Sequence, residues 1–355
     1  MAQISVIIVN FNTCALLRTC LLSLLAAEHR RPVNVVIVDN GSTDGSAEMV
    51  RCEFPRVAIY EQKTNLGFAA ASNLGAATTD APWLLFLNPD TEVGHGVVDA
   101  LVDFAATHPR PGIYGGRTVF ADGSDNVASC WNAPTPWSVS SRALGFASLF
   151  RRSEFFNAEE IGGWRRDSVR EVDYVVGCFL LIERTLWERL GGFDTRYWMY
   201  GEDCDLCLRA TAITGHRPLI TPAAEIVHHV GAASADAAER KIHILRSRAT
   251  LIRRHWPRWQ QGWGLDMETL WVLTRVLVSA AYARSGGPEG QPRARRWARI
   301  WAARREWRRG WPEAMDRPRK RLGKRDRISR FVGSIVDPRA WSHLLRMVNY
   351  WNYAH

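Results

Sequence analysis

The first 110 residues alternate between short apolar runs and longer segments with helical spacing. The apolar runs have the length and composition of buried parallel strands, and they cover residues 4–9, 33–38, 57–61 and 83–87. The segments that follow them have the spacing or the small residues of helices, and they cover residues 15–27, 47–54, 68–77 and 97–108. Strands that alternate with helices indicate βαβ units, so the pattern predicts an α/β fold with a mostly parallel sheet.

The pattern becomes less regular after this region. Strands are predicted at residues 113–120 and 172–182, and the stretch between them is rich in Ser, Trp and Arg and is expected to be loop-like. Helices are predicted at residues 183–190 and 203–214, and a glycine ends each of them.

Two acidic residues follow predicted strands. Ligands of open α/β sheets bind beyond the carboxyl ends of the strands, so we expect Asp39 and Asp90 to lie near one crevice. Asp90 ends the sequence Asn88-Pro89-Asp90, where a carboxylate can ligate a divalent cation and a diphosphate can supply most of the other oxygens. Because Asn-Pro is also a common turn former, a strand-ending turn is the alternative.

A segment of small residues, NLGFAAASNLG, covers residues 65–75. Glycines and small side chains let a helix N-terminus approach a phosphate. The segment lacks both the Walker lysine and the G-x-G-x-x-G spacing, so neither common nucleotide motif applies. Tight helix–strand packing would explain the small residues, but it would not explain Asn65 and Asn73.

Three acids stand at the predicted start of a helix in the sequence YGEDCDLCLR. Glu202, Asp203 and Asp205 either cap this helix as exposed acids or form a cluster in which one carboxylate acts as a general base. The Cys204-x-x-Cys207 spacing lacks a second cysteine pair, so zinc is not expected here.

A histidine pair follows an apolar run in the sequence IVHHVGAAS. His228 and His229 are either structural, or one of them ligates a metal together with Asp90.

The composition limits the class of protein. The chain has 355 residues and is 46% hydrophobic and 23% charged, as globular proteins are. Seven cysteines, an odd number at irregular spacing, indicate a reducing cytosol rather than a disulfide framework. The first residues have no basic segment before their short apolar run, and no window of 18 apolar residues occurs, so neither a signal peptide nor a membrane span is expected.

The C-terminal third differs in charge and in tryptophan content. The chain is expected to be helical to about residue 283, with a linker at residues 285–292. Residues 293–330 hold sixteen Lys/Arg and four Asp/Glu, a local net charge of +12 against +10 for the whole chain. Tryptophans recur among these arginines at roughly helical spacing, which favours an interfacial helix on an anionic membrane. A solvated charged helix and nucleic-acid binding are the alternatives, and nucleic acid is not the expected partner.

Together these motifs closely resemble glycosyltransferase family 2, and within it the rhamnosyltransferase-like branch. The resemblance covers residues 4–235 in order, through SVIIVNFNT, VDNGSTDGS, NLGFAAASNLG, FLNPDTEV, VDYVVGCFLLIERTLWERLGGFD, YWMYGEDCDLCLRA and PAAEIVHHVGAAS. It implies a GT-A fold, in which a Rossmann-like nucleotide half joins an acceptor half, and a single displacement that inverts the anomeric centre.

The resemblance also implies roles for individual residues. Asp39 would contact the base of the donor, Asp90 would be the main ligand of Mg²⁺ or Mn²⁺, and His228 would complete that site, with His229 as the other register. Asp203 would be the general base, supported by Glu202 and Asp205. The donor-binding set would be Asn10, Asp39, Thr43, Asp44, Asn65, Gly67, Asn73, Asn88 and Asp90. The acceptor pocket would contain Gly177, Cys178 and Trp198, and the last two depart from the branch pattern.

We therefore expect a GT-A catalytic domain at residues 1–240, a helical extension at 241–284 and a basic, membrane-attaching tail at 285–355. The expected donor is dTDP-rhamnose, with a UDP- or GDP-sugar as the alternative. The expected acceptor is a lipid-linked (polyprenyl-linked) or cell-surface glycan. The expected location is cytoplasmic, peripheral on the inner face of the cytoplasmic membrane. A nucleic-acid-binding protein with a degenerate transferase domain is the competing class.

Overall fold

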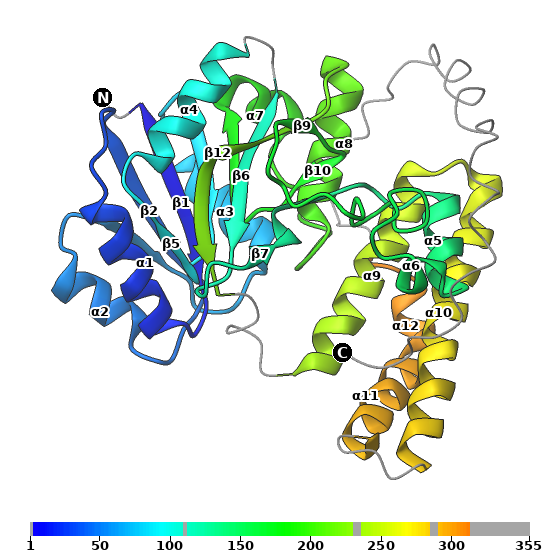
Figure 1. Cartoon of the computed structure of the whole chain (residues 1–355). Coiled ribbons are helices and arrows are strands. Elements are labelled where there is room, and N and C mark those ends of the chain that lie inside the picture. The colour runs from blue at the N-terminus through cyan, green and yellow to red at the C-terminus, as the bar shows by residue number, and fades with distance from the viewer. Residues whose placement is uncertain (1–2, 109–111, 230–235, 285–289, 313–355) are drawn as a thin grey trace. The chain divides into compact units, whose positions relative to one another are not determined.

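The structure is a computed structural model that describes residues 3–108, 112–229, 236–284 and 290–312 (Figure 1). A ten-stranded sheet forms its centre, with the strand order β3-β2-β1-β4-β11-β6-β12-β5 and with β7 and β9 attached to β6 and β12. The strands are β1 Ile4–Asn10, β2 Val33–Asp39, β3 Ala58–Glu61, β4 Trp83–Leu87, β5 Thr91–Val93, β6 Ile113–Val119, β7 Asp125–Asn126, β9 Arg170–Glu171, β11 Phe179–Glu183 and β12 Leu219–His228.

The sheet is parallel in its first half and mixed in its second. Strands β3, β2, β1 and β4 are all parallel, which confirms the predicted βαβ units. Strand β11 runs antiparallel to β4 and β6, whereas β12 runs parallel to β6. A separate pair joins β8 Cys130–Trp131 to β10 Tyr174–Val175.

Helices cover both faces of the sheet. One face packs on α1 Cys14–Ala26, α2 Ser46–Glu53 and α4 Val97–Thr107. The other packs on α3 Phe68–Ala77, α7 Arg184–Leu190 and α8 Glu202–Thr214. Successive strand residues serve opposite faces, as the period of two requires: Leu85 belongs to the first core and Phe86 to the second. Each predicted helix of this region is present within two residues of its expected bounds.

The predicted strand at 172–182 is wrong as a single element. It breaks at Gly177, because β10 pairs with β8 while β11 pairs with β4 in the main sheet. The amide of Val176 donates to the carbonyl of Ser129, and the chain then turns toward the main sheet.

The stretch expected to be loop-like contains α5 Pro136–Ala143, α6 Phe146–Leu149 and the short η1 Val127–Ser129. Helix α5 begins with a capping box, in which Thr135 and Ser138 exchange side-chain and backbone hydrogen bonds, and with proline at its first position. The sequence Thr-Pro-x-Ser is a helix-start signal. The prediction missed this helix because it relied on the Ser-, Trp- and Arg-rich composition, which suggested a loop.

Four further helices extend from residue 237 to residue 307. They are α9 Ala237–His255, α10 Arg258–Arg284, α11 Gly290–Ala302 and α12 Arg304–Trp307. With α5 they enclose a core that contains Leu245, Trp271, Ile300 and Trp307. Helix α9 runs unbroken through the expected domain boundary at residue 240. None of the described helices is long and apolar enough to cross a bilayer.

The expected interfacial orientation of the tail is wrong where the structure describes it. Trp307 is completely buried and Ile300 nearly so, while Trp297 and Trp301 pack against the same core. The Trp297 ring meets the Trp271 ring edge-on, with 5.3 Å between centroids. The large apolar area of these indoles is therefore buried inside the protein, and lipid does not cover it. Residues 313–355, the rest of the predicted tail, lie outside the described residues.

Candidate active site

The carboxyl ends of β1 and β2 hold the first group of polar residues. Asn10 and Asp39 end their strands side by side in register, and both are buried. The Asn10 amide donates to Asp39 Oδ1 at 2.8 Å, and the amide of Ser42 donates to Asp39 Oδ2 at 3.0 Å. These hydrogen bonds orient the Asp39 carboxylate at the sheet edge, where it can accept from a ligand that approaches the strand ends.

The loop around Asn65 and Gly67 is built on Asn40, a residue absent from the predicted set. Asn40 donates to Asn65 Oδ1 at 2.9 Å and accepts from the amide of Leu66 at 2.9 Å. Gly67 has φ +81, and a Cβ there would lie 2.2 Å from the carbonyl oxygen of Trp198. Only glycine permits this approach, so Gly67 fixes the loop against the segment before α8.

Thr43 and Asp44 lie in the exposed turn after β2. Asp44 accepts from the amide of Cys14 at 2.8 Å and from the amide of Ser46 at 3.1 Å. Its carboxylate therefore ties this turn to the start of α1. The hydrogen bonds lower the pKa of Asp44 although its partial burial opposes them.

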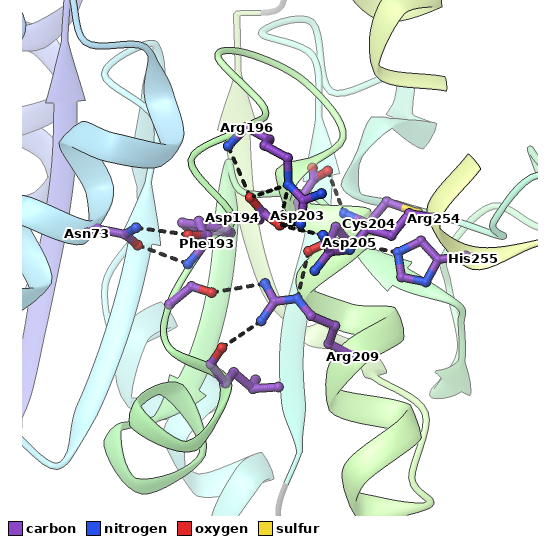
Figure 2. A network of polar contacts seen from close by, with 12 residues as sticks. Asn73, Phe193, Asp194, Arg196, Asp203, Cys204, Asp205, Arg209, Arg254 and His255 are labelled. Carbon is purple, nitrogen blue, oxygen red and sulfur yellow. Dashed lines mark hydrogen bonds and ion pairs between the residues drawn. The ribbon is translucent and has the colours of Figure 1, made fainter. Parts of the chain in front are cut away.

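Asn73 performs a positioning task in this structure. Its amide nitrogen donates to the carbonyl of Phe193 at 2.9 Å, and its oxygen accepts from the Phe193 amide at 2.9 Å (Figure 2). Both polar groups are thus engaged, and they fasten α3 to the loop that leads to α8.

Asp90 and His228 meet where β5 pairs with β12. The pairing sets Thr91 opposite His228, so Asp90 Oδ1 lies 3.3 Å from His228 Nε2. The next residue, His229, points the other way and bonds Glu92 at 2.6 Å. The His228 ring, and not the His229 ring, therefore lies beside Asp90.

The surroundings of Asp90 and His228 fit a divalent cation. Asp90 Oδ1 and His228 Nδ1 are buried without a hydrogen-bond partner among the described residues. Burial lowers the pKa of His228, but the Cys178 thiol and the Asp90 carboxylate outweigh burial and raise the pKa to about 10. A metal bound through His228 would have to displace this proton, because only the neutral imidazole ligates a cation. The described part of the chain brings together no set of three or more His, Cys, Asp or Glu suited to a metal, so other oxygens would have to complete the coordination.

The start of α8 carries two buried carboxylic acids. Burial raises the pKa of Asp203 to about 6, against the hydrogen bonds that its carboxylate accepts from the amides of Cys204 and Gly177. Burial and the neighbouring Asp203 raise the pKa of Glu202 well above its usual range, and its Oε2 has no partner in the described structure. Tyr200 and Gly201, which precede these acids, both have left-handed backbone conformations. Such conformations in series are typical of constrained functional sites.

Asp205 has a different environment from its two neighbours. It is fully buried and accepts from Arg209 Nε at 2.6 Å, while Arg254 Nε and His255 Nε2 each lie 2.8 Å from its Oδ1 (Figure 2). Arg254 also pairs with Asp194 at 2.8 Å. With cations on both of its oxygens, Asp205 anchors α8 to α9 and positions the acids beside it.

Gly177 and Cys178 connect the acidic pair with the Asp90 site. The Gly177 amide donates to Asp203, and the carbonyl of Cys178 accepts from the amide of Asn88 at 3.2 Å. The Cys178 thiol raises the pKa of His228. One two-residue turn therefore contacts both halves of the candidate site.

Trp198, predicted in the acceptor pocket, lies between two elements. Its carbonyl accepts from the amide of Phe68 at 2.8 Å, and its ring lies 6.5 Å from that of Trp311 and 5.2 Å from that of His243. Trp311 in turn donates to Ser247 at 2.7 Å. The end of the described chain thus packs on the loop that precedes α8.

Solved structures with the same arrangement are glycosyltransferases. The mannosyltransferase PcManGT from Pyrobaculum calidifontis, in complex with GDP-Man and Mn²⁺, has a TM-score of 0.51 and 19% identity over 85% of this chain and 86% of that chain. GalNAc-T7 with UDP, GalNAc and Mn²⁺ has a TM-score of 0.50 and 14% identity over 75% of this chain and 54% of that chain. The fold is therefore that of a GT-A glycosyltransferase.

The family follows from the sequence comparisons. The model of glycosyl transferase family 2 matches residues 5–173. An N-acetylglucosaminyl-diphospho-decaprenol L-rhamnosyltransferase of Mycobacterium tuberculosis is 31% identical over 283 residues, which cover 74% of this chain and 89% of that protein. The chain belongs to glycosyl transferase family 2 and is a glycosyltransferase.

Proposed function

We propose that the protein is an inverting, divalent-metal-dependent rhamnosyltransferase that uses dTDP-rhamnose and a lipid-linked glycan acceptor. The observation that carries the proposal is that Asp90 lies beside His228 at the sheet edge. The Gly177–Cys178 turn connects this pair with the buried acids of α8. The relative named above supports the sugar and the lipid-linked acceptor, since its name specifies L-rhamnose and a diphospho-decaprenol.

The donor would bind along the strand ends. Asp39 offers a carboxylate held by Asn10 and by the Ser42 amide, and the Asn65–Gly67 loop closes one side of this edge. Asp90 and His228 would hold Mg²⁺ or Mn²⁺, and the donor diphosphate would supply further oxygens. When bound, such a cation stabilises the negative charge of the diphosphate leaving group.

Asp203 would take the proton of the acceptor hydroxyl. A base works best when its pKa lies near the operating pH, and the burial of Asp203 moves its pKa in that direction. Burial and the neighbouring Asp203 also raise the pKa of Glu202, so the pair would favour one negative charge over two. Attack on the anomeric carbon from the side opposite the diphosphate inverts the configuration in one step, so no covalent sugar–enzyme bond is needed.

The remaining parts of the proposal concern organisation. We propose that residues 1–240 bind the donor and carry the base, and that residues 241–284 support them through α9 and α10. A lipid-linked acceptor would keep the enzyme at the inner face of the cytoplasmic membrane. Gly177, Cys178 and Trp198 would border the acceptor, since they contact the loop and the helix that carry Asp203.

A donor panel tests the proposal. Binding of dTDP-rhamnose, UDP-sugars and GDP-sugars is measured by calorimetry with Mg²⁺, with Mn²⁺ and with excess chelator. We expect dTDP-rhamnose to bind only with metal, and Asp90→Ala to lose both binding and transfer. Asp167→Ala, on an exposed loop, is the matched control and should bind normally. Full activity of the native protein in chelator would refute the metal, and preference for another nucleotide-sugar would refute the donor.

A further inference from the structure

Large apolar side chains are exposed on α5, on α6 and the loop after it, and on the first turns of α10. Leu144 is 59%, Leu149 is 56% and Phe155 is 57% exposed. On α10, Trp259 is 77% and Trp263 is 54% exposed. An exposed apolar area of this kind marks a surface that meets a partner or a membrane.

Helix α5 joins these side chains into one surface, because it lies along α10 (Figure 1). Its Trp137 packs on Phe155 with 4.7 Å between ring centroids, and its Ser140 accepts a hydrogen bond from Trp263 Nε1 at 3.1 Å. Residues three apart on a helix share a face, so both contacts lie on one side of α5. We name the surface the α5–α10 face; it consists of Trp137, Leu144, Leu149, Phe155, Trp259 and Trp263.

The free charge around the α5–α10 face is positive. The guanidinium groups of Arg151, Arg152 and Arg258 are exposed, and the described structure contains no ion pair for any of them. Four of the five carboxylates of residues 135–160 and 256–270 have arginine partners: Glu154 has Arg170, Glu159 has Arg248, Asp266 has Arg308 and Glu268 has Arg142. The fifth, Glu160, accepts from the Asn157 amide, so three free arginines stand against one free carboxylate. Unpaired cations beside exposed indoles suit an anionic lipid surface.

The α11–α12 segment offers the opposite arrangement. Its indoles pack inward on Trp271 and Leu245, and its outer side presents arginines such as Arg295 and Arg296. Residues 290–312 expose no large apolar side chain, although Leu277, Val278 and Tyr282 of α10, which packs on α11, are exposed. Arginines alone provide only the electrostatic half of an interfacial anchor. The described part of the tail therefore lacks the exposed apolar side chains that the sequence pattern predicted for membrane insertion.

We propose that the α5–α10 face is the surface with which the enzyme docks on an anionic lipid bilayer. The indoles of Trp259 and Trp263 and the side chains of Leu149 and Phe155 enter the headgroup region, and the three arginines contact lipid phosphates. Such docking would bring a lipid-linked acceptor to the protein, and in this respect the inference rests on the proposed function.

Vesicle co-sedimentation of the full chain tests the proposal without donor or acceptor. Vesicles of phosphatidylcholine alone and of phosphatidylcholine with phosphatidylglycerol are compared. Leu149→Asp combined with Trp259→Asp should weaken binding to the anionic vesicles by at least about tenfold. Arg151→Gln combined with Arg258→Gln should weaken it by about fivefold for each arginine, and only when phosphatidylglycerol is present.

Two control variants carry the same chemistry on other surfaces. Leu22→Asp with Leu25→Asp replaces two exposed leucines of α1, and Arg295→Gln with Arg296→Gln removes two charges of α11. The proposal is supported if vesicle binding is unchanged in the leucine control of α1 and falls at most modestly in the arginine control of α11. Circular dichroism verifies that each variant folds. If Leu149→Asp with Trp259→Asp does not fold, Leu149→Ser with Trp259→Ser takes its place.

Three results would overturn the proposal. The first is unchanged vesicle binding by the α5–α10 variants. The second is loss of binding only in the α11 variant, which would make the tail the anchor. The third is unchanged vesicle binding with a shift from dimer to monomer in sedimentation, which would make the face an interface between copies. Transfer to a water-soluble acceptor analogue is measured separately, so failure of the docking surface and failure of the proposed reaction are distinguishable.

Discussion

Replacement of Asp203 by asparagine should stabilise the protein and inactivate it at the same time. Burial raises the pKa of Asp203 from 3.8 to about 6, so the folded state disfavours the ionised carboxylate. This difference corresponds to about 3 kcal/mol at neutral pH, part of which is shared with Glu202. Asparagine keeps the shape and cannot ionise, so Asp203→Asn should gain stability of this order at pH 8.

The pH dependence gives the prediction its sign. Between pH 3.8 and pH 6 the folded native protein binds the proton that the unfolded chain has lost, so its stability falls as the pH rises through this window. The Asn variant has no such loss. The gain should therefore be full at pH 8 and should disappear below about pH 4. Urea unfolding of both proteins at the two pH values measures it.

Activity supplies the second half of the test. Loss of a positioned base lowers kcat by about 10²–10⁴-fold, and the native kcat should rise with pH through about 6 as Asp203 ionises. Donor affinity should change little. Asp99→Asn is the control, since this buried carboxylate pairs with Arg31 at 2.9 Å and its neutralisation should destabilise. Equal or lower stability of Asp203→Asn at pH 8 would refute the burial argument, and a retained kcat would refute the assignment as base.

Two further predictions concern the frame around the site. Asp205→Asn should cost about 3 kcal/mol in urea unfolding, because it removes the charge of a fully buried carboxylate that pairs with Arg209 and Arg254. Asp266→Asn removes an exposed pair and should cost at most about 1 kcal/mol, and equal costs would contradict the proposed anchoring. Gly67→Ala should abolish donor binding in calorimetry, because its Cβ would lie 2.2 Å from a backbone oxygen, whereas Gly123→Ala, with a similar φ and open space, should bind donor normally. Normal donor binding by Gly67→Ala would show that this loop does not shape the donor site.

Local pattern was sufficient for the nucleotide half of the fold. Short continuous apolar runs and the helices between them predict β1, β2 and β4, and the parallel-sheet rule puts Asp39 and Asp90 at one edge. The left-handed glycines and the capped helix starts are also encoded locally. Helix α5 belongs to this class too, because its Thr-Pro-x-Ser start is a signal within four residues.

Contacts between distant residues could be assigned only from the tertiary structure. The sequence does not distinguish His228 from His229. The pairing of β12 with β5 decides which of them faces Asp90. Asp205 stands in the same acidic motif as Asp203, yet Arg254 and His255, about fifty residues later, pair with it. Likewise, the side-chain amide nitrogen and oxygen of Asn73 both bond to the backbone of Phe193, 120 residues away.

The tail shows the same division between sequence and structure. Its amphipathic Trp/Arg pattern is real, and the sequence by itself predicted a helix with tryptophans among arginines at helical spacing. A hydrophobic stripe gains free energy from any apolar surface that removes it from water, and the pattern does not specify whether that surface is lipid or protein. Only the fold decides, because α9 and α10 offer a complementary core in which Trp307 is completely buried.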